Sequence, residues 1–393
     1  MAERGMITLI SGSGSGNPGP LVEVRGDLVQ CVSVNNKYAL RNAIRKPRGP
    51  FVGTDSAELR QPVMADVAKL AGVSHQTVSR VLNGAPHVRP DTRDRVLAAI
   101  RELDYRPNSA ARALVTKRSQ TLGVVSFDST LYGPASMLDG IEQAARSAGY
   151  FVSVASLRSL DSRSVQEAVD RLRDQGVEGV VVIAPQISAV SAVARLNSSV
   201  PVVAVGSGNQ ARVPMVSVDN QAGATAATQH LLDLGHETVH HLGGPTGWLE
   251  SQDRQAGWRQ TLEAAGARVP QVYSGDWSAR SGYQAGLRLA EDPEVSAVFC
   301  ANDHMALGLL RAMHEAGRSI PGDISVVGFD DIHEAAYFTP PLTTVRQDFG
   351  ELGRRALELL VDAVAGAGQA REHALISAEL VLRRSSGPAP ARA

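Results

Sequence analysis

The 393-residue sequence contains little cysteine. Cys31 and Cys300 are its two cysteines, and neither belongs to a CxxC motif. A disulfide-stabilised scaffold and a zinc ribbon are both excluded, because each needs more cysteines at closer spacing. The low cysteine content fits a reducing compartment.

Long apolar runs and a secretory leader are also missing. No run approaches the roughly 20 apolar residues that a membrane-spanning helix needs. The N-terminus has no basic start followed by an apolar stretch and a cleavage site. We therefore expect a cytoplasmic protein without a membrane partner.

Signatures of catalysis and of cofactor binding are lacking as well. The segment GSGNPG (14–19) has the spacing of a dinucleotide loop, but Pro18 and Pro20 prevent the helix that must follow. The segment HETVH (236–240) matches a zinc-protease motif, yet it runs into a strand-like segment that cannot hold such a site. No nucleophile–base pair or P-loop is evident, so we expect no enzyme, no cofactor and no metal.

Charge is present in both signs but is unevenly distributed. Residues 62–118 contain ten Lys/Arg and five Asp/Glu, a net charge of +5. Residues 119–393 contain 21 and 30, a net charge of −9. A small basic module beside a larger acidic body is typical of proteins that read nucleic acid. On charge alone, chance clustering on a solvated surface remains an alternative.

The basic module has the pattern of three short helices. A turn at 71–73 separates the first helix from the second, which Ser74 opens as an N-cap and Gly84 ends. Asp91 is expected to cap the third helix, within 89–105. Three helices with so tight a turn predict a helix–turn–helix.

The second helix presents hydrogen-bonding side chains and no carboxylate. A helix–turn–helix places this helix in the major groove of DNA. Glutamine can pair with adenine and arginine with guanine, so Gln76 and Arg80, with His75 beside them, are suited to reading bases. An ordinary helical bundle is the alternative, which the polar face and the basic flank disfavour.

Strands and helices alternate after Thr121. Apolar strands between helices predict parallel sheets covered on both faces, and two such series predict two similar α/β lobes. The expected strands of the first series are 122–127, 150–156, 177–184, 201–205 and 215–219. Those of the second lie within 238–244, 297–303 and 324–331.

Polar and aromatic residues follow several of these strands, where ligands of such folds bind. Trp277, Asn302 and Asp330, together with Arg254 at the start of a helix, would suit a polyol. The ring covers the apolar face of a sugar while the polar groups take its hydroxyls. Taken one at a time, each of these residues is better explained as an ordinary core or surface residue.

Five segments carry a family resemblance: SHQTVSRVLNGAPHV (74–88), GDWSARSG (275–282), ANDHMALG (301–308), DISVVGFDD (323–331) and PPLTTVRQDF (340–349). They resemble segments of the LacI/GalR family of bacterial transcriptional repressors, and the resemblance extends over about 63–385. It implies a homodimer on palindromic double-stranded operator DNA and a small sugar effector, with a galactoside as the first candidate.

The resemblance also implies the fold. We expect a small all-α helix–turn–helix domain joined by a hinge helix to an α/β core. That core would be two-lobed and like periplasmic binding proteins, with a parallel sheet in each lobe. The expected regions are the helix–turn–helix domain (62–106), the hinge helix and linker (107–118), the sugar-binding and dimerisation core (119–385) and a flexible tail (386–393). The resemblance does not extend to residues 1–61. Their linker-like Gly, Pro and Ser content predicts a mostly disordered extension, with a wrongly chosen start as the alternative.

Site residues follow from the same motif matches. The implied DNA contacts are Ser74, His75, Gln76, Thr77, Ser79, Arg80, Asn83, His87, Asn108 and Leu114. Leu114 would be the hinge residue that wedges into the minor groove. The implied effector contacts are Leu131, Pro134, Arg254, Trp277, Asn302, Asp330, Gln347 and Phe349.

Several departures from the family pattern bear on specificity. This chain has Phe127, Ile183 and Gly206 where the matched pattern is polar, so half of the pocket should be less polar and another sugar stays open. His75 replaces a tyrosine, which leaves the operator sequence open. The tail SSGPAPARA (385–393) lacks an apolar heptad, which argues against a tetramer.

Other function classes are weighed against this interpretation. Within the family, an activator or dual regulator is an alternative to a repressor. A sugar-binding protein without a DNA-binding role would need a leader and no helix–turn–helix. A sugar-modifying enzyme would need a catalytic constellation, and none is visible.

Overall fold

The computed structural model describes residues 62–82, 84–106, 118–127, 130–157, 159, 161–208, 213–367 and 373–391. The chain divides into two units, Met1–Val63 and Met64–Ala393. The extension expected at 1–61, almost all of the expected hinge at 107–118, and the implied DNA contacts Asn83, Asn108 and Leu114 lie outside the described residues. No helix in the described part of the chain is long and apolar enough to span a membrane.

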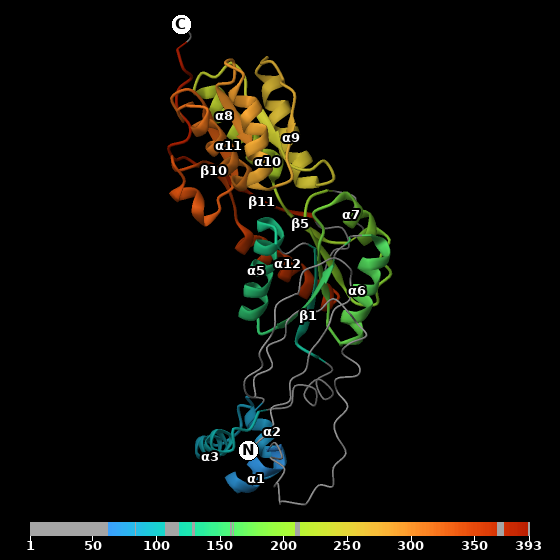
Figure 1. Cartoon of the computed structure of the whole chain (residues 1–393). Helices are drawn as coiled ribbons and strands as arrows, with labels where there is room; N and C mark the ends of the chain where they lie inside the picture. The colour runs from blue at the N-terminus through green and yellow to red at the C-terminus, as the bar shows by residue number, and fades with distance from the viewer. Residues whose placement is uncertain are drawn as a thin grey trace, which may run out of the picture. The chain divides into compact units, whose positions relative to one another are not determined.

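Three short helices form the region that was expected to bind DNA: α1 (Met64–Ala71), α2 (His75–Leu82) and α3 (Pro90–Glu102) (Figure 1). They share a small core that includes Val67, Val78 and Val96, all three fully buried. Such a core needs all three helices, because no single helix of this length is stable in water.

Capping residues set the ends of these helices. The backbone N–H of Thr77 donates to the hydroxyl of Ser74 at 3.2 Å, which confirms the expected cap of α2. Gly84 ends that helix with a φ of 69°. The cap expected at Asp91 is wrong: Arg89 is the N-cap, because Pro90 takes the first helical position, where its fixed φ is favourable.

The first lobe is built on a fully parallel sheet. Its strand order is β11-β5-β4-β3-β1-β2. Valines of β3 alternate between the two faces of the sheet and are buried on both. The strands are β1 (Thr121–Phe127), β2 (Phe151–Leu157), β3 (Val180–Ile183), β4 (Val202–Val205), β5 (Met215–Val218) and β11 (His373–Ile376).

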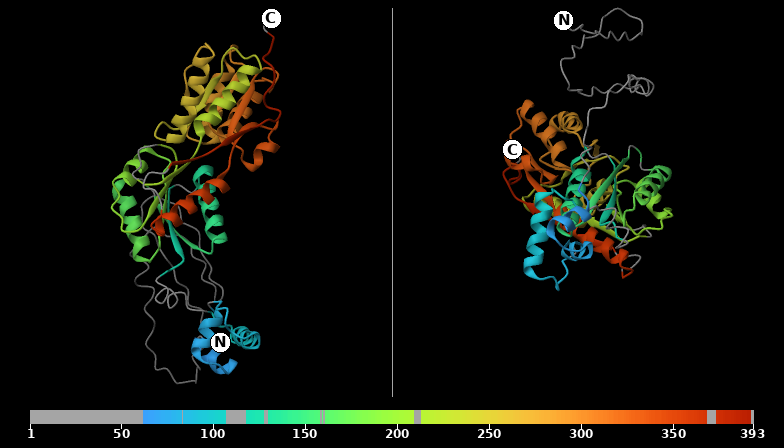
Figure 2. Two further views of the ribbon diagram at one scale, coloured as in Figure 1. Left: turned by 180° about the vertical axis from the view of Figure 1, so that it is seen from behind. Right: turned by 90° about the horizontal axis from the view of Figure 1, so that it is seen from below.

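Two pairs of helices cover the two faces of this sheet (Figures 1 and 2). One pair is α5 (Tyr132–Ser147) and α12 (Phe349–Val364), and the other is α6 (Ser162–Asp174) and α7 (Ile187–Ala194). Helix α5 begins at Tyr132, shortly after β1 ends at Phe127. Its first turn therefore lies directly after β1, where it can contribute to a ligand site.

The second lobe repeats this plan with one antiparallel edge. Its strand order is β12-β10-β9-β8-β6-β7, and the β10–β12 pair is antiparallel. The strands are β6 (His240–Gly243), β7 (Tyr273–Ser274), β8 (Ala297–Cys300), β9 (Ser325–Asp330), β10 (Thr343–Gln347) and β12 (Ala378–Val381). Its helices are α8 (Asn220–Asp233), α9 (Leu249–Ala264), α10 (Ala279–Ala290), α11 (Asp303–Glu315) and the 3-10 helix η1 (His333–Tyr337).

Both sheets have the order expected of doubly wound folds. Two clusters of buried residues sandwich the second sheet, one beneath α8 and α9 and one beneath α10 and α11. The two mostly parallel, doubly covered sheets confirm the predicted two-lobed α/β core. In each sheet the strand order reverses beside the first strand, which is β1 in the first lobe and β6 in the second. Ligands of such folds bind at the carboxyl ends of the strands beside this point.

Within the residues that the structure describes, the polypeptide passes between the lobes three times, each time through one residue. Asp219 links β5 to α8, Asp348 links β10 to α12, and Ser377 links β11 to β12. Asp219 and Asp348 also cap the helices that follow them. The backbone N–H of Asp219 donates to the carbonyl of Ile376 at 2.8 Å, which ties two of the crossings together.

The end of the described chain is fixed to the second lobe. The backbone N–H of Gly387 donates to the hydroxyl of Ser325 at 3.0 Å, and that of Ala389 donates to the carbonyl of Leu234 at 2.9 Å. Residues 386–389 are thus not part of the flexible tail expected from 386, because these contacts hold their backbone.

Candidate functional site

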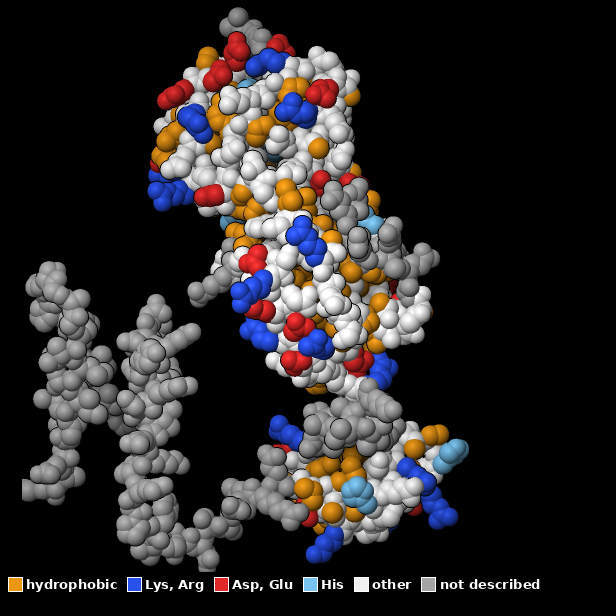
Figure 3. Space-filling model, turned by 90° about the vertical axis from the view of Figure 1, so that its right-hand side faces the viewer, with side chains coloured by type: hydrophobic (Ala, Val, Ile, Leu, Met, Phe, Trp, Pro, Cys, Tyr) orange, Lys and Arg blue, Asp and Glu red, His pale blue; other side chains and the backbone are white. Residues whose placement is uncertain are grey.

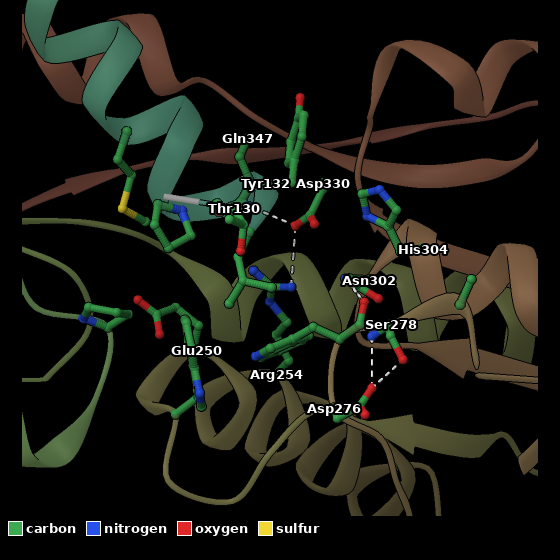
Figure 4. A pocket seen from close by; sticks show the side chains of 18 residues that line it. Thr130, Tyr132, Glu250, Arg254, Asp276, Ser278, Asn302, His304, Asp330 and Gln347 are labelled. Carbon is green, nitrogen blue, oxygen red and sulfur yellow. Dashed lines mark hydrogen bonds and ion pairs between the residues drawn. The ribbon is translucent and has the colours of Figure 1, made fainter. Parts of the chain in front are cut away.

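A cavity of about 320 Å³ lies at the carboxyl ends of strands from both lobes (Figure 4). This volume is within the range of roughly 300–1,000 Å³ that is usual for small-molecule sites. The first lobe supplies the start of α5 and Pro185, two residues after β3. The second lobe supplies the segments after β6, β7 and β8 and the last residues of β9 and β10. The lining residues are Thr130, Leu131, Tyr132, Gly133, Pro134, Met137, Pro185, Trp248, Glu250, Arg254, Asp276, Trp277, Ser278, Ala279, Asn302, His304, Asp330 and Gln347.

A buried ion pair lies at the centre of the cavity. Arg254 Nη1 is 3.4 Å from Asp330 Oδ1, and both side chains are at most 7% exposed. Arg254 Nε donates to Asn220 Oδ1 at 2.8 Å, and Gln347 Nε2 donates to Asp330 Oδ1 at 2.7 Å. The guanidinium also lies 3.8 Å from the ring centroid of Phe329. These contacts fix the orientation of three polar side chains that line the cavity, those of Arg254, Asp330 and Gln347.

Asp330 is strained as well as buried. Its φ is 110°, which a residue with a side chain rarely adopts. Burial raises the pKa of Asp330 to about 6, although Arg254, His304 and Gln347 all act in the opposite direction. Strain and desolvation of this kind concentrate at ligand-binding positions.

Asn302 positions Trp277. Its Oδ1 accepts the backbone N–H of Met305 at 2.9 Å and so caps α11, while its Nδ2 donates to the carbonyl of Trp277 at 3.1 Å. Trp277 has a φ of 72° and meets Trp248 edge to face, with ring centroids 5.7 Å apart. The cavity therefore has an aromatic wall, and Asn302 holds the backbone of Trp277 in it.

The first lobe forms the apolar rim. Leu131 and Pro134, at the start of α5, line the cavity as the motif match implied. Phe349 does not: its ring packs against Tyr132 in an edge-to-face contact at 6.0 Å. Tyr132, between the two rim residues, faces the cavity instead, so Phe349 supports the wall from behind.

The three departures from the family pattern do not line this cavity. Ile183 is fully buried in the core, and Phe127 packs against the α6–α7 cluster. Gly206, with a φ of 142°, has no room for a side chain, because a Cβ there would overlap the carbonyl of Ala184. The lower polarity expected for half of the pocket therefore does not follow from these positions.

Other polar residues after the strands have structural roles. Asp303 is buried and accepts hydrogen bonds from the hydroxyl of Thr344 at 2.6 Å and the backbone N–H of Ile332 at 2.9 Å. Asp331 pairs with Arg346 and Arg383. A position at the end of a strand thus predicts the region of the site. It does not distinguish residues that contact a ligand from residues, such as Asp303 and Asp331, that stabilise the structure.

Besides Thr130, sequence reasoning missed six polar or aromatic residues of the cavity. Their signal was weak, because a residue at the start of a helix is usually a capping or surface residue. Asp276 does accept a hydrogen bond from the backbone N–H of Ser278 at 3.0 Å, as such a residue would. The missed residues are Tyr132, Trp248, Glu250, Asp276, Ser278 and His304.

The polar face of α2 is arranged as the sequence indicated. His75, Gln76 and Arg80 are exposed, whereas Val78 and Val81 are buried. Ser74 and His87 are also exposed, and Thr77 and Ser79 are half-buried. Basic and histidine side chains are prominent on the visible surface of these three helices (Figure 3). The three exposed side chains of α2 can all donate hydrogen bonds.

Comparison with known proteins decides the family. Residues 63–108 match the family model for bacterial regulatory proteins of the lacI family, and residues 228–386 match that for a periplasmic binding protein-like domain. The lactose operon repressor of Escherichia coli (strain K12) is 34% identical over 330 residues, which cover 84% of this chain and 91% of that protein. The chain belongs to the lacI family of bacterial regulatory proteins.

Two further relatives are also transcriptional regulators. The repressor PurR of Mannheimia succiniciproducens is 33% identical over 325 residues, which cover 81% of this chain and 97% of that protein. The regulator CelR of Thermobifida fusca is 34% identical over 341 residues, which cover 83% of this chain and 98% of that protein. All three relatives are transcriptional regulators, so the chain is a DNA-binding regulator of the lacI family.

Solved structures of the lacI family share the fold. The crystal structure of the lac repressor dimer bound to operator and the anti-inducer ONPF is similar with a TM-score of 0.75 and 34% identity, over 84% of this chain and all of that chain. A complex of CelR with cellobiose is similar with a TM-score of 0.62 and 33% identity, over 82% of this chain and 99% of that chain.

Proposed function

We propose that this regulator is a homodimeric repressor that binds a palindromic operator and leaves it when a small sugar enters the cavity. The buried Arg254–Asp330 pair carries the proposal, because it leaves fixed polar groups beside an aromatic wall. That combination is what a sugar needs, since a sugar has an apolar face and a rim of hydroxyls.

For DNA, we assign the exposed face of α2 to the major groove. Gln76 and Arg80 would contact base edges, and Ser74, His75, Thr77, Ser79 and His87 would contact bases or phosphates near them. The likeness to a lac repressor dimer bound to operator supports this assignment. Asn83, Asn108 and Leu114 remain proposed DNA contacts outside the described residues.

For the effector, a galactoside is the first candidate. Similarity to the lactose operon repressor supports it, whereas relatives that include PurR and CelR make a non-galactoside effector the alternative. Arg254, Asp330 and Gln347 would hold hydroxyls, and Trp277 would cover one ring face. The sugar can release DNA only by binding the DNA-free arrangement more tightly than the DNA-bound one.

The test measures operator and random-sequence DNA binding, with and without galactosides and glucosides. Arg80→Ala should weaken operator binding by about 1–3 kcal/mol and random DNA much less. Asp330→Asn should bind operator normally but lose the sugar response. Asparagine suits this test because it keeps the shape of aspartate and tolerates a positive φ better than alanine does.

Two matched controls accompany these variants. Arg95→Ala removes an exposed arginine from α3, and Asp233→Asn changes an aspartate at the end of α8, away from the cavity. Equal losses on both DNAs for Arg80→Ala would contradict the α2 assignment. An effector that acts equally on Asp330→Asn and wild type would contradict the assignment of the cavity.

A further inference from the structure

The carboxyl group of Glu250 is buried in the wall of the cavity without a partner. The residue is 5% exposed, and neither carboxyl oxygen has a hydrogen-bond partner among the described residues. Buried polar groups are almost always paired, so such an exception needs an explanation. Because Glu250 lines the cavity, a ligand is the natural partner (Figure 4).

Helix stability does not explain this glutamate. Glu250 lies in the first turn of α9, where an acidic side chain can favour the helix dipole. A carboxylate with that role normally accepts backbone N–H bonds of the first turn or faces water. Glu250 is buried, and neither of its carboxyl oxygens makes a hydrogen bond of normal geometry among the described residues. The backbone N–H groups of Glu250 and Ser207 act to lower its pKa, but burial has the larger effect. Its burial also raises its pKa to about 8, so the group is mostly uncharged near neutral pH and can both donate and accept.

The backbone holds Glu250 in place. Leu249 N donates to the carbonyl of Pro185 at 3.0 Å, and Gln186 and Trp248 form an antiparallel bridge. These contacts join the start of α9 to the segment after β3, in the other lobe. The side chain is therefore placed by two elements that themselves line the cavity.

Glu250 lies apart from the other polar groups of the cavity. In Figure 4 its side chain is at one end of the row, Asp276 and Ser278 are at the other, and Arg254 and Asp330 lie between them. Trp248, two residues before Glu250, adds a second aromatic ring to the wall beside Trp277. The cavity thus has two pairings of an aromatic ring with hydrogen-bonding groups: Trp277 with Arg254 and Asp330, and Trp248 with Glu250. A single sugar ring needs only one such pairing.

We propose that Glu250 is a specificity-determining residue of a second sugar subsite, so that the effector is a neutral glycoside with two rings. One ring occupies the Arg254–Asp330–Trp277 subsite of the proposed function, on which this inference rests. Hydroxyls of the other ring satisfy the carboxyl group of Glu250. A single-ring sugar leaves that carboxyl group buried and unpaired, and it therefore binds less tightly.

Calorimetric titration of the full chain with matched sugars tests this inference. The pairs are galactose with lactose and glucose with cellobiose, and the proteins are wild type, Glu250→Leu and Glu250→Gln. Wild type should bind one disaccharide at least tenfold more tightly than its monosaccharide. Glu250→Leu should remove at least tenfold of that preference, and Glu250→Gln, which keeps a donor and an acceptor, should restore most of it.

Glu263→Gln is the matched control, because Glu263 is an exposed acid on the same helix. A monosaccharide that binds as tightly as its disaccharide, or a preference that survives Glu250→Leu, would overturn this inference and leave the proposed function intact. Failure of folded wild type to bind any of the four sugars would count against both.

Discussion

Protonation of a single residue should make stability depend on pH. Burial raises the pKa of Glu250 from its ordinary value of 4.5 to about 8. Between these values the folded protein binds a proton that the unfolded chain has released. The contribution of Glu250 to the free energy of unfolding is therefore largest at low pH and is lost as pH rises toward 8.

The measurement is the melting temperature of wild type and Glu250→Gln between pH 5 and pH 8. We expect wild type to lose up to about 3 kcal/mol relative to the variant over this range. His241, whose pKa burial lowers to about 4, and Asp330 titrate in both proteins, so their effects cancel in the difference. Parallel curves for the two proteins would show that Glu250 titrates normally.

Single residues also show where sequence reasoning succeeds and where it stops. The Ser74 cap could be predicted, because a cap depends on its next few neighbours. Asp330 and Trp277 could be placed at the site, because they follow strands and match a motif. Glu250 could not, since whether an acid at the start of a helix faces water or a cavity depends on the opposite lobe. The position of Phe349 behind Tyr132 is a similar case.

At the scale of elements, two helices of the first lobe cross unusually closely. Gly140 of α5 lies against the backbone of α12, where an added Cβ would overlap the carbonyl of Phe349. A Cβ at Gly133, on the same helix, would have no neighbour within 4 Å. The two glycines thus differ in packing while sharing a helix.

Alanine substitutions separate these two cases. Gly140→Ala should destabilise the fold by roughly 1–3 kcal/mol, because it forces α5 away from α12. Gly133→Ala should be neutral or stabilise by up to about 1 kcal/mol, since alanine favours a helix over glycine. Denaturant unfolding of both variants measures the difference. Equal effects would mean that the crossing can relax without cost.

Elements were predictable where their pattern is local. The valine-rich strands β3 and β4 could be recognised because a strand buried on both faces is continuously apolar. Strands β11 and β12 could not be separated, because HALISAELV reads as one extended segment. Only the two sheets show that the strand changes lobes after Ile376, and that pairing depends on residues more than 150 positions earlier.

For the whole molecule, coupling between the two proposed sites must be reciprocal. If a sugar weakens operator binding by some factor, operator must weaken sugar binding by the same factor. We expect about 1–3 kcal/mol per site. Operator affinity measured with and without saturating sugar, and sugar affinity measured with and without saturating operator, should give one value. If the sugar affinity is the same with and without operator, the sugar tested is not the effector that releases DNA.

The three single-residue crossings limit how such coupling can be transmitted. Each crossing offers one pair of backbone torsions, at Asp219, Asp348 and Ser377, and two of these residues are also held as helix caps. Three short links between two rigid bodies act as a pivot, with very few degrees of freedom. A ligand that touches both lobes can therefore set little besides one angle between them. Ligands that differ slightly in size would therefore hold the two lobes at slightly different angles. The displacement of the far end of a lobe would then grow with the length of that lobe.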